Sequence, residues 1–293
     1  MTIVLAGAIS PNRSPWANVW RESARCNERQ AIDSARLFSP GDGAAGAPRR
    51  HARAPRPALE SGPPACYRLG VTASADLFDA IGAGDLGAVD RLLSARPYLA
   101  GSSNAAGLTA VTAAAYAQQP TIVERILAAK PDLDRFEAAI VGDLSRLSEL
   151  LDETDAEPID QRSGDGFTAL HLAAFFGRLR TAQELLDRGA DPNAWALGDL
   201  RVQPLHSAVA GGHEAVARLL VAHGAQPDQP QRGGYTPLHA AAANDMTALA
   251  DFLVEHGANP KALTEDILTP ADLAERAGHV ELAAQLRRLA GPG

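Results

Sequence analysis

Histidines are the residues whose type and number most readily suggest chemistry in this 293-residue chain. Seven of the eight lie between His171 and His279. Histidine can move protons near neutral pH or bind a metal, but a metal site needs converging ligands, usually with carboxylates or thiols. His171, His206 and His239 instead occupy one position of a repeated pattern, which favours a structural role. We therefore expect no metal and no cofactor.

Two other motifs could support catalysis or nucleotide binding, and both have simpler interpretations. Residues 82–87 (GAGDLG) match the dinucleotide fingerprint. That fingerprint requires a preceding strand and an acidic residue about 20 positions later, yet no acid lies between Asp90 and Glu124. The run 152–157 (DETDAE) offers paired carboxylates, but such charge runs usually form solvated loops. We expect no catalytic residue and no enzymatic activity in these motifs.

Charge and proline content divide the chain near residue 72. Residues 1–70 hold ten arginines and five acids, a net charge of +5, together with eight of the 20 prolines. The other 223 residues hold 17 bases and 30 acids, a net charge of −13. This composition predicts that residues 1–72 are disordered. The negative remainder disfavours nucleic acid as a partner and suggests a neutral or basic protein surface.

Targeting and redox features are sparse. No apolar run reaches the roughly 18 residues of a membrane span, and residues 2–9 lack the basic flank of a signal peptide. Two cysteines, Cys26 and Cys66, are too few for a disulfide framework. We expect a cytoplasmic protein that does not contact a membrane. The 25 arginines against two lysines suggest a GC-rich genome such as a bacterial one.

Internal repeats determine the fold prediction. Similar segments recur at TALHLAA (168–174), QPLHSAV (203–209), TPLHAAA (236–242) and TPADLA (269–274). A second signature keeps the same register, with RGADPN, HGAQP and HGANP beginning at Arg188, His223 and His256. Amphipathic stretches ending in paired large apolar residues lie between the two signatures. A fixed period of 33–35 residues is typical of stacked repeat proteins.

These signatures closely resemble those of the ankyrin repeat family. The resemblance implies an all-α solenoid of about seven stacked helix pairs with short β-hairpin loops, preceded by the disordered segment. Its structural residues would be Thr168, His171, Gly189, His206, Gly224, Thr236, His239 and Gly257. In the family the turn histidine orders the loop, and we expect Thr168 and Thr236 to cap helices and the glycines to end them. Gln203 replaces threonine, so its cap should be weaker.

Weaker copies extend the pattern upstream. Each repeat has a short link between its first and second helix. An aliphatic residue falls eight positions after each of these links, at Leu92, Ile126, Leu150, Leu185, Leu220, Leu253 and Leu286. The single interval of 24 between Ile126 and Leu150 indicates one connection without its hairpin. The predicted solenoid spans 73–291, divided as 73–104, 105–133, 134–164, 165–200, 201–233, 234–265 and 266–291.

Binding residues are expected on first helices and hairpin tips, the concave face of such a solenoid. The two residues before each link are not needed for folding in this pattern: Tyr116-Ala117, Phe175-Phe176, Ala210-Gly211, Ala243-Asn244 and Arg276-Ala277. The hairpin after Gly189 is two residues longer than its neighbours. The predicted contact residues are Tyr116, Phe167, Phe175, Phe176, Trp195, Leu197, Arg201, Arg232 and Tyr235, although aromatic residues serve cores as readily as interfaces.

We interpret the chain as a non-catalytic, monomeric adaptor that binds another protein by rigid surface complementarity. Two alternatives place an activity in residues 1–70: an enzymatic function with the repeats as a docking scaffold, or nucleic-acid binding by the arginine-rich segment.

Overall fold

The computed structural model describes residues 65–130, 132–153, 157–198 and 201–291. These residues form two compact units, divided between residues 130 and 132. Within them the regular structure is helical, with two short 3-10 helices and two isolated β-bridges. The all-α prediction is therefore confirmed. Of the segment 1–72 that is predicted to be disordered, residues 1–64 lie outside the described part of the chain and residues 65–72 belong to a helix.

The first unit holds two helix pairs and a 3-10 turn. They are α2 (Ala65–Ala83), α3 (Leu86–Ala95), η2 (Pro97–Gly101), α4 (Ala110–Tyr116) and α5 (Pro120–Ala129). Helix α2 packs on α3 and α4, and α3 packs on α5. Helix α2 begins eight residues before the predicted boundary at 73. The stretch Ala65–Ala83 contains no proline, so nothing interrupts the helical hydrogen bonds there.

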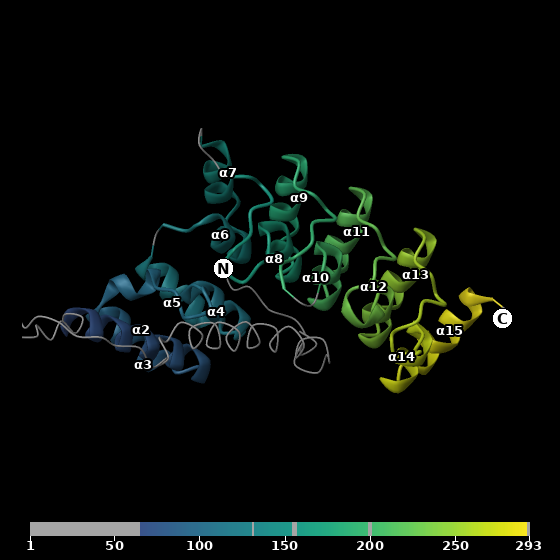
Figure 1. Cartoon of the computed structure of the whole chain (residues 1–293), viewed down its shortest axis with the longest axis horizontal. Helices are drawn as coiled ribbons and strands as arrows, with labels where there is room; N and C mark the ends of the chain where they lie inside the picture. Colours follow the sequence, from purple (N-terminus) through teal and green to yellow (C-terminus); the bar gives the residue numbers. More distant parts are fainter. Residues whose placement is uncertain (1–64, 131, 154–156, 199–200, 292–293) are drawn as a thin grey trace, which may run out of the picture. The chain divides into compact units, whose positions relative to one another are not determined.

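The second unit holds five helix pairs arranged in two rows (Figure 1). The first helices are α6 (Arg135–Val141), α8 (Ala169–Phe175), α10 (Pro204–Ala210), α12 (Pro237–Ala243) and α14 (Pro270–Arg276). The second helices are α7 (Leu144–Asp152), α9 (Leu179–Asp187), α11 (Glu214–Ala222), α13 (Thr247–Glu255) and α15 (Val280–Ala290), and η3 (Arg232–Gly234) lies in a loop. With the first unit this makes the seven predicted pairs.

Small side chains allow close packing within the first row. Alanines at equivalent positions, such as Ala173, Ala208 and Ala241, are fully buried where α8, α10 and α12 contact their neighbours. The second row contributes larger apolar groups, and Leu185, Leu220 and Leu253 are completely buried as expected. Burial of these side chains against the next pair supplies the main stabilisation.

Two of the predicted core markers are displaced. Leu92 and Leu150 are only half-buried, whereas Leu93 and Leu147 have 1% and 0% of their surface exposed. Each marker lies on the same helix as the buried leucine, α3 or α7, at one or three residues from it. Counting from the link therefore identifies these helices correctly but not which of their leucines is most buried.

The expected threonine caps are present at α8 and α14, whereas Thr236 lies at the N-cap of α12 without a side-chain capping bond. Thr168 and Thr269 accept a hydrogen bond from the third helical N–H, at 3.4 and 3.2 Å. Pro204, Pro237 and Pro270 occupy the first turn, where a missing N–H has no cost. The side-chain amide of Gln203 donates to the Asn193 carbonyl at 2.9 Å and does not cap α10.

The turn histidines connect each repeat to the next. His171 Nε2 lies 3.2 Å from the Val202 carbonyl, His206 Nε2 lies 3.0 Å from that of Gln229, and His239 Nε2 lies 3.1 Å from that of Leu268. Because a carbonyl only accepts, Nε2 carries the proton and Nδ1 accepts from the helix N-cap (Thr168, Gln203, Thr236). Burial lowers the pKa of His171 to about 3 and that of His206 to about 4.

Other side chains take the histidine position in weaker repeats. Glu137 is fully buried in α6, where its Oε2 accepts the Asp134 N–H at 3.1 Å while Asp134 accepts the Glu137 N–H. Asp272 receives the N–H and hydroxyl of Thr269 at 2.9 and 2.7 Å, and these bonds lower the pKa of Asp272. A carboxylate at this position therefore accepts a hydrogen bond from the N-cap, as histidine Nδ1 does. It cannot replace histidine Nε2, which donates to a carbonyl of the next loop.

In the repeat of α6, an arginine supplies the donor that the turn histidine supplies elsewhere. Arg135 is the first residue of α6 and is 8% exposed. Its guanidinium donates to the carbonyls of Glu157 and Pro158 at 3.0 and 2.8 Å. It thus makes a contact to the following loop that other repeats make through the turn histidine.

Links between the two helices of a pair form a second set of cross-repeat bonds. Arg178 Nε donates to the Ile140 carbonyl at 2.7 Å, and His279 Nε2 lies 3.2 Å from the Ala243 carbonyl. His213 is hydrogen bonded to the Phe175 carbonyl in the same way. Met246 occupies the equivalent position, as the N-cap of α13, and a thioether cannot donate.

Five loops between pairs share a closing backbone hydrogen bond, at 2.8 to 3.0 Å. The closing pairs are Asn104–Leu108, Ser163–Phe167, Ala196–Val202, Gln231–Tyr235 and Thr264–Leu268. The 196–202 loop has two more residues than the others, as predicted. Only isolated β-bridges, and no strands, are present among the described residues, so these are hairpin-like turns and not extended β-hairpins.

Glycines in these loops have two different functions. Gly189, Gly224 and Gly257 follow second helices at φ of +91° to +102°, and a Cβ there would meet nothing within 4 Å. Gly166 and Gly234 are also left-handed, but a Cβ would lie 2.9 Å from Leu197 Cβ or from the Leu263 carbonyl. The second group permits contact between adjacent loops.

We predict that stability falls as the pH drops below about 6.5, the ordinary histidine pKa. The lowered pKa values mean that the unfolded chain binds protons that the folded chain excludes, at about 1.4 kcal/mol per pH unit for each buried histidine. Urea unfolding at pH 7, 6 and 5 measures this slope. His206→Asn keeps an acceptor but cannot titrate, so its slope should be shallower; an unchanged slope would contradict this explanation.

Met246→His is predicted to stabilise the protein by about 1 kcal/mol, the net contribution of one added hydrogen bond. The new imidazole would donate across the repeat boundary as His213 and His279 do. Thermal and urea unfolding provide the measurement, and Met246→Leu is the matched control without a donor. Equal stability of the two variants would show that the cross-repeat bond contributes nothing.

Gly234→Ala is predicted to destabilise more than Gly224→Ala. Both positions are left-handed, and this costs alanine about 1 kcal/mol. Only Gly234 also faces backbone at 2.9 to 3.2 Å, so overpacking should add about 2 kcal/mol. Urea unfolding of the two variants decides the matter, and similar losses would mean that the adjacent loop moves away freely.

Candidate protein-binding surface

The loop tips around Trp195 bring together four residues of the second unit. Arg162 donates through Nε and one terminal nitrogen to the Trp195 carbonyl at 3.1 and 2.8 Å. The Arg201 guanidinium carbon lies 5.2 Å from the centroid of the Trp195 ring. Leu197 lies between Trp195 and Arg201 in the sequence, and 63% of its surface is exposed. We call Arg162, Trp195, Leu197 and Arg201 the Trp195 cluster.

Two of the cluster's loops are held together by the backbone. The Leu197 N–H donates to the Gly166 carbonyl at 2.9 Å, and the Ala196 N–H donates to the Val202 carbonyl at 2.9 Å. Gly166 has no room for a Cβ because Leu197 lies against it. The arrangement is therefore rigid at the base of the exposed side chains.

Phe167 is a core residue, contrary to its predicted role in binding. It is 7% exposed, and its ring packs on that of His171 with centroids 5.8 Å apart. It lies directly before the N-cap, where Leu108 and Val202 are buried in the same way. Apolar residues at this position of other repeats, Leu108 and Val202, are the sequence signal for its burial.

The remaining predicted contact residues lie at least partly at the surface. Phe175 and Phe176 end α8, are half-buried and pack edge to face with centroids 5.1 Å apart. Tyr235 is half-buried against His239, and Arg232 is exposed. Tyr116 is half-buried at the end of α4 in the first unit.

Gly211 does not belong to the positions that can vary freely. A Cβ on Gly211 would lie 2.2 Å from the Phe175 carbonyl and 2.7 Å from the His213 ring. The end of α10 therefore approaches α8 through this glycine. Sequence spacing could not show this, because the contact joins different repeats.

Two loop tips carry non-glycine residues in a left-handed conformation. The residue two places before the N-cap is Gly107, Gly166 or Gly234 in three repeats, with φ of +78° to +88°. Arg201 and Ile267 occupy the equivalent place at φ of +48° and +59°. The left-handed conformation costs an L-residue about 1–2 kcal/mol, so these side chains are retained despite local strain.

The residues that could suggest catalysis have structural partners. Both ring nitrogens of His171, His206 and His239 are engaged, and within the described residues no three His, Cys, Asp or Glu side chains gather as a metal site would require. Asp152, from the acidic run, pairs with Arg188 at 2.6 Å, and this hydrogen bond lowers the pKa of Asp152.

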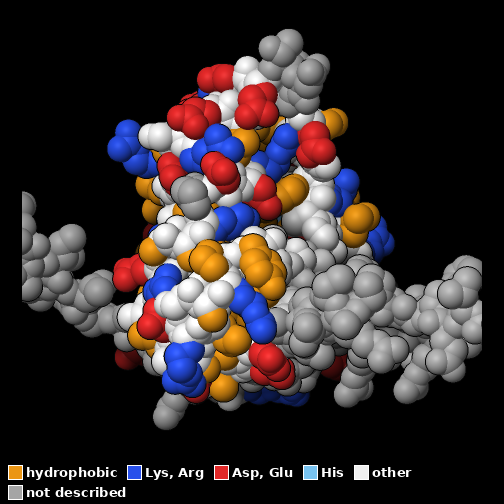
Figure 2. Space-filling view, turned by 90° about the vertical axis from the view of Figure 1, so that its left-hand side faces the viewer, with side chains coloured by type: hydrophobic (Ala, Val, Ile, Leu, Met, Phe, Trp, Pro, Cys, Tyr) orange, Lys and Arg blue, Asp and Glu red, His pale blue; other side chains and the backbone are white. Residues whose placement is uncertain are grey.

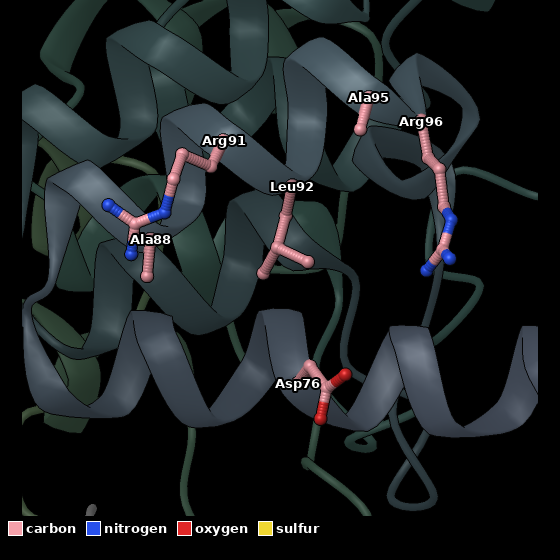
Figure 3. Close-up of a pocket in the computed structure, with 6 residues that line it drawn as sticks. All are labelled: Asp76, Ala88, Arg91, Leu92, Ala95 and Arg96. Atoms are coloured by element: carbon pink, nitrogen blue, oxygen red, sulfur yellow. The ribbon is translucent and has the colours of Figure 1, made fainter.

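A pocket of about 400 Å³ lies between α2 and α3 of the first unit (Figure 3). It is lined by Asp76, Ala88, Arg91, Leu92, Ala95 and Arg96. Figure 3 shows Asp76 rising from α2 toward α3, with Arg91 and Arg96 at either end of the α3 row. These side chains offer ionic and apolar contacts but no nucleophilic or imidazole group.

Charges of both signs are interspersed with hydrophobic side chains on the face shown in Figure 2. No helix in the described ranges has the length and apolar character needed to cross a membrane.

Arg162 and Arg201 of the Trp195 cluster are positively charged, whereas residues 71–293 as a whole carry a net charge of −13.

Sequence reasoning predicted Trp195, Leu197 and Arg201 but missed Arg162. Arg162 lies 33 residues before Trp195, one repeat period away. That spacing was an available signal, because equivalent loop positions of adjacent repeats lie side by side in a solenoid.

Comparisons with known proteins agree with this architecture. A family model of three ankyrin repeat copies matches residues 77–196 and 198–266, and a second model of many copies matches 172–221. Zygote-specific protein 3 of Chlamydomonas reinhardtii is 36% identical over 109 residues, which cover 36% of this chain and 28% of that protein.

Two further relatives have similar local matches. A probable E3 ubiquitin-protein ligase of Oryza sativa subsp. japonica is 41% identical over 90 residues, covering 30% of this chain and 20% of the ligase. Neurogenic locus notch homolog protein 4 of Homo sapiens is 35% identical over 148 residues, covering 46% of this chain and 7% of that protein. The likeness thus spans well under a third of each relative's length. The family models match more than half of the chain, which belongs to the ankyrin repeat family.

Proposed function

We propose that this protein is a non-catalytic adaptor that binds a partner protein through its first-helix ends and loop tips. Ankyrin repeats generally mediate protein–protein interaction and are typically non-catalytic. The Trp195 cluster is the observation that supports the proposal most strongly. A half-buried aromatic ring with guanidinium groups and an exposed leucine has the composition of an interface anchor.

The proposed surface comprises the predicted residues that remain accessible in part. In the second unit these are Phe175, Phe176, Trp195, Leu197, Arg201, Arg232 and Tyr235. Tyr116 is proposed as a contact of the first unit, and Phe167 is omitted because it is buried. Rigid helices and tied loops allow binding with little loss of conformational entropy.

Enzymatic activity is the alternative to the adaptor function. One relative is named as a probable E3 ubiquitin-protein ligase, but the match covers 20% of that protein. Any such activity would depend on residues outside the repeats, as would the proposed alternative of nucleic-acid binding by residues 1–70. Removing residues 1–64 separates the possibilities, since the adaptor proposal expects binding of the partner to survive.

The proposal keeps three expectations from the sequence. The domain organisation is an arginine- and proline-rich segment followed by a solenoid ending at 291. The protein acts as a monomer in the cytoplasm. Its partner presents a surface that is mainly neutral or basic, in keeping with the net charge of −13 over residues 71–293.

Combined Phe176→Ala and Trp195→Ala substitution is predicted to abolish partner capture with less than about 2 kcal/mol of destabilisation. Affinity capture with quantitative mass spectrometry compares this variant with the wild type. Leu179→Ala, which removes a leucine that is 42% exposed on α9, is the matched control. Undiminished capture by the double variant, or equal loss in the control, would place the binding surface elsewhere.

A further inference from the structure

We propose that the Trp195 cluster binds an acidic peptide segment of the partner, one that carries Asp or Glu beside an apolar side chain. The inference rests on the proposed function and specifies the chemistry of what this surface recognises. It concerns only Arg162, Trp195, Leu197 and Arg201, which occupy two adjacent loops.

Both guanidinium groups are oriented by the tryptophan. Arg162 uses two N–H groups on the Trp195 carbonyl, and a guanidinium has five in a planar fork. Its remaining donors lie on the edges directed away from that carbonyl. The Arg201 guanidinium carbon lies 5.2 Å from the indole centroid, and such a cation–π contact consumes no hydrogen-bond acceptor. Carboxylates match this planar donor geometry better than any other protein group.

Local backbone strain distinguishes Arg201 from the glycines of three equivalent loops, a property that it shares with Ile267. Three equivalent loops have glycine at this left-handed position, and Arg201 adopts it at φ +48°. Glycine would relieve the strain, but it would remove the cation above Trp195. Strain that persists at an exposed loop tip is typical of binding sites.

The apolar part of the recognised segment is inferred from Leu197 and the indole. Leu197 is 63% exposed, and its backbone is tied to Gly166 at 2.9 Å. Its side chain is therefore presented in a defined place. A peptide with an apolar residue next to a carboxylate would contact the leucine and a guanidinium together.

Charge favours a peptide over a nucleic acid. Two guanidinium groups attract a carboxylate over about the 10 Å Debye length at 0.1 M salt. A longer polyanion also meets the field of residues 71–293, whose net charge is −13, and is repelled. The local chemistry thus differs from the neutral or basic character expected for the partner surface as a whole.

The test is selection of random 12-residue peptides by phage display against the immobilised full-length protein. We expect enriched peptides to contain Asp or Glu beside an apolar residue. The corresponding synthetic peptide, labelled with fluorescein, should bind at least tenfold more weakly to Arg201→Gln and to Arg162→Gln. Arg180→Gln removes an exposed arginine of α9 and should bind normally.

Arg201→Gly distinguishes binding from folding. Glycine suits the left-handed backbone, so this variant should unfold at a higher urea concentration than wild type while binding the peptide at least tenfold more weakly. Normal peptide binding by Arg201→Gly would overturn the proposal, as would enriched peptides without acidic residues.

Two further outcomes separate this inference from the proposed function. Peptides or proteins that bind equally well to wild type, Arg162→Gln, Arg201→Gln and Arg201→Gly would overturn the acidic-peptide inference alone. Failure to obtain any peptide or protein ligand would count against the adaptor function and the inference together. Tighter binding of a dT12 oligonucleotide than of the selected peptide would assign the cluster to nucleic acid and overturn the proposal.

Discussion

The structure depends on the burial of each helix pair's apolar side chains against the next pair. A pair whose first helix has only seven residues, as in α8, α10 and α12, cannot enclose a core alone. Leu185, Leu220 and Leu253 lose all exposed surface because neighbours cover them. Stability therefore accumulates along the stack through nearest-neighbour contacts. The turn histidines, the link residues and Arg135 all act at such contacts.

Polar groups make these contacts specific. The turn histidines, the link residues Arg178 and His279, and Arg135 all donate from one repeat to a backbone carbonyl of another. A buried carbonyl that lacks a donor is costly, so each bond favours one register of stacking. Both ring nitrogens of each turn histidine are taken up by these hydrogen bonds, so neither is left to bind a metal or to exchange a proton with a substrate in the folded state.

The candidate surface is formed by loop side chains that the stacking of the helix pairs does not bury. Its loops need glycine wherever the adjacent loop comes close, as at Gly166 and Gly234. The longer loop that contains Arg201 departs from that pattern and places a cation over Trp195. Arg201 therefore combines backbone strain, exposure and positive charge. The hydrogen bonds beneath the loop keep this residue and Trp195 in a defined position for a partner.

The amino-acid sequence by itself determined the repeat period, the seven helix pairs, the threonine caps and the left-handed glycines, because these follow from hydrogen bonds and dihedral angles within a few residues. Only the tertiary structure decided that Phe167 is buried, that Gly211 admits no side chain and that Arg162 joins Trp195. Those features depend on residues about one repeat apart coming into contact. The distance and angle between stacked repeats set such contacts, and a periodic pattern does not specify either.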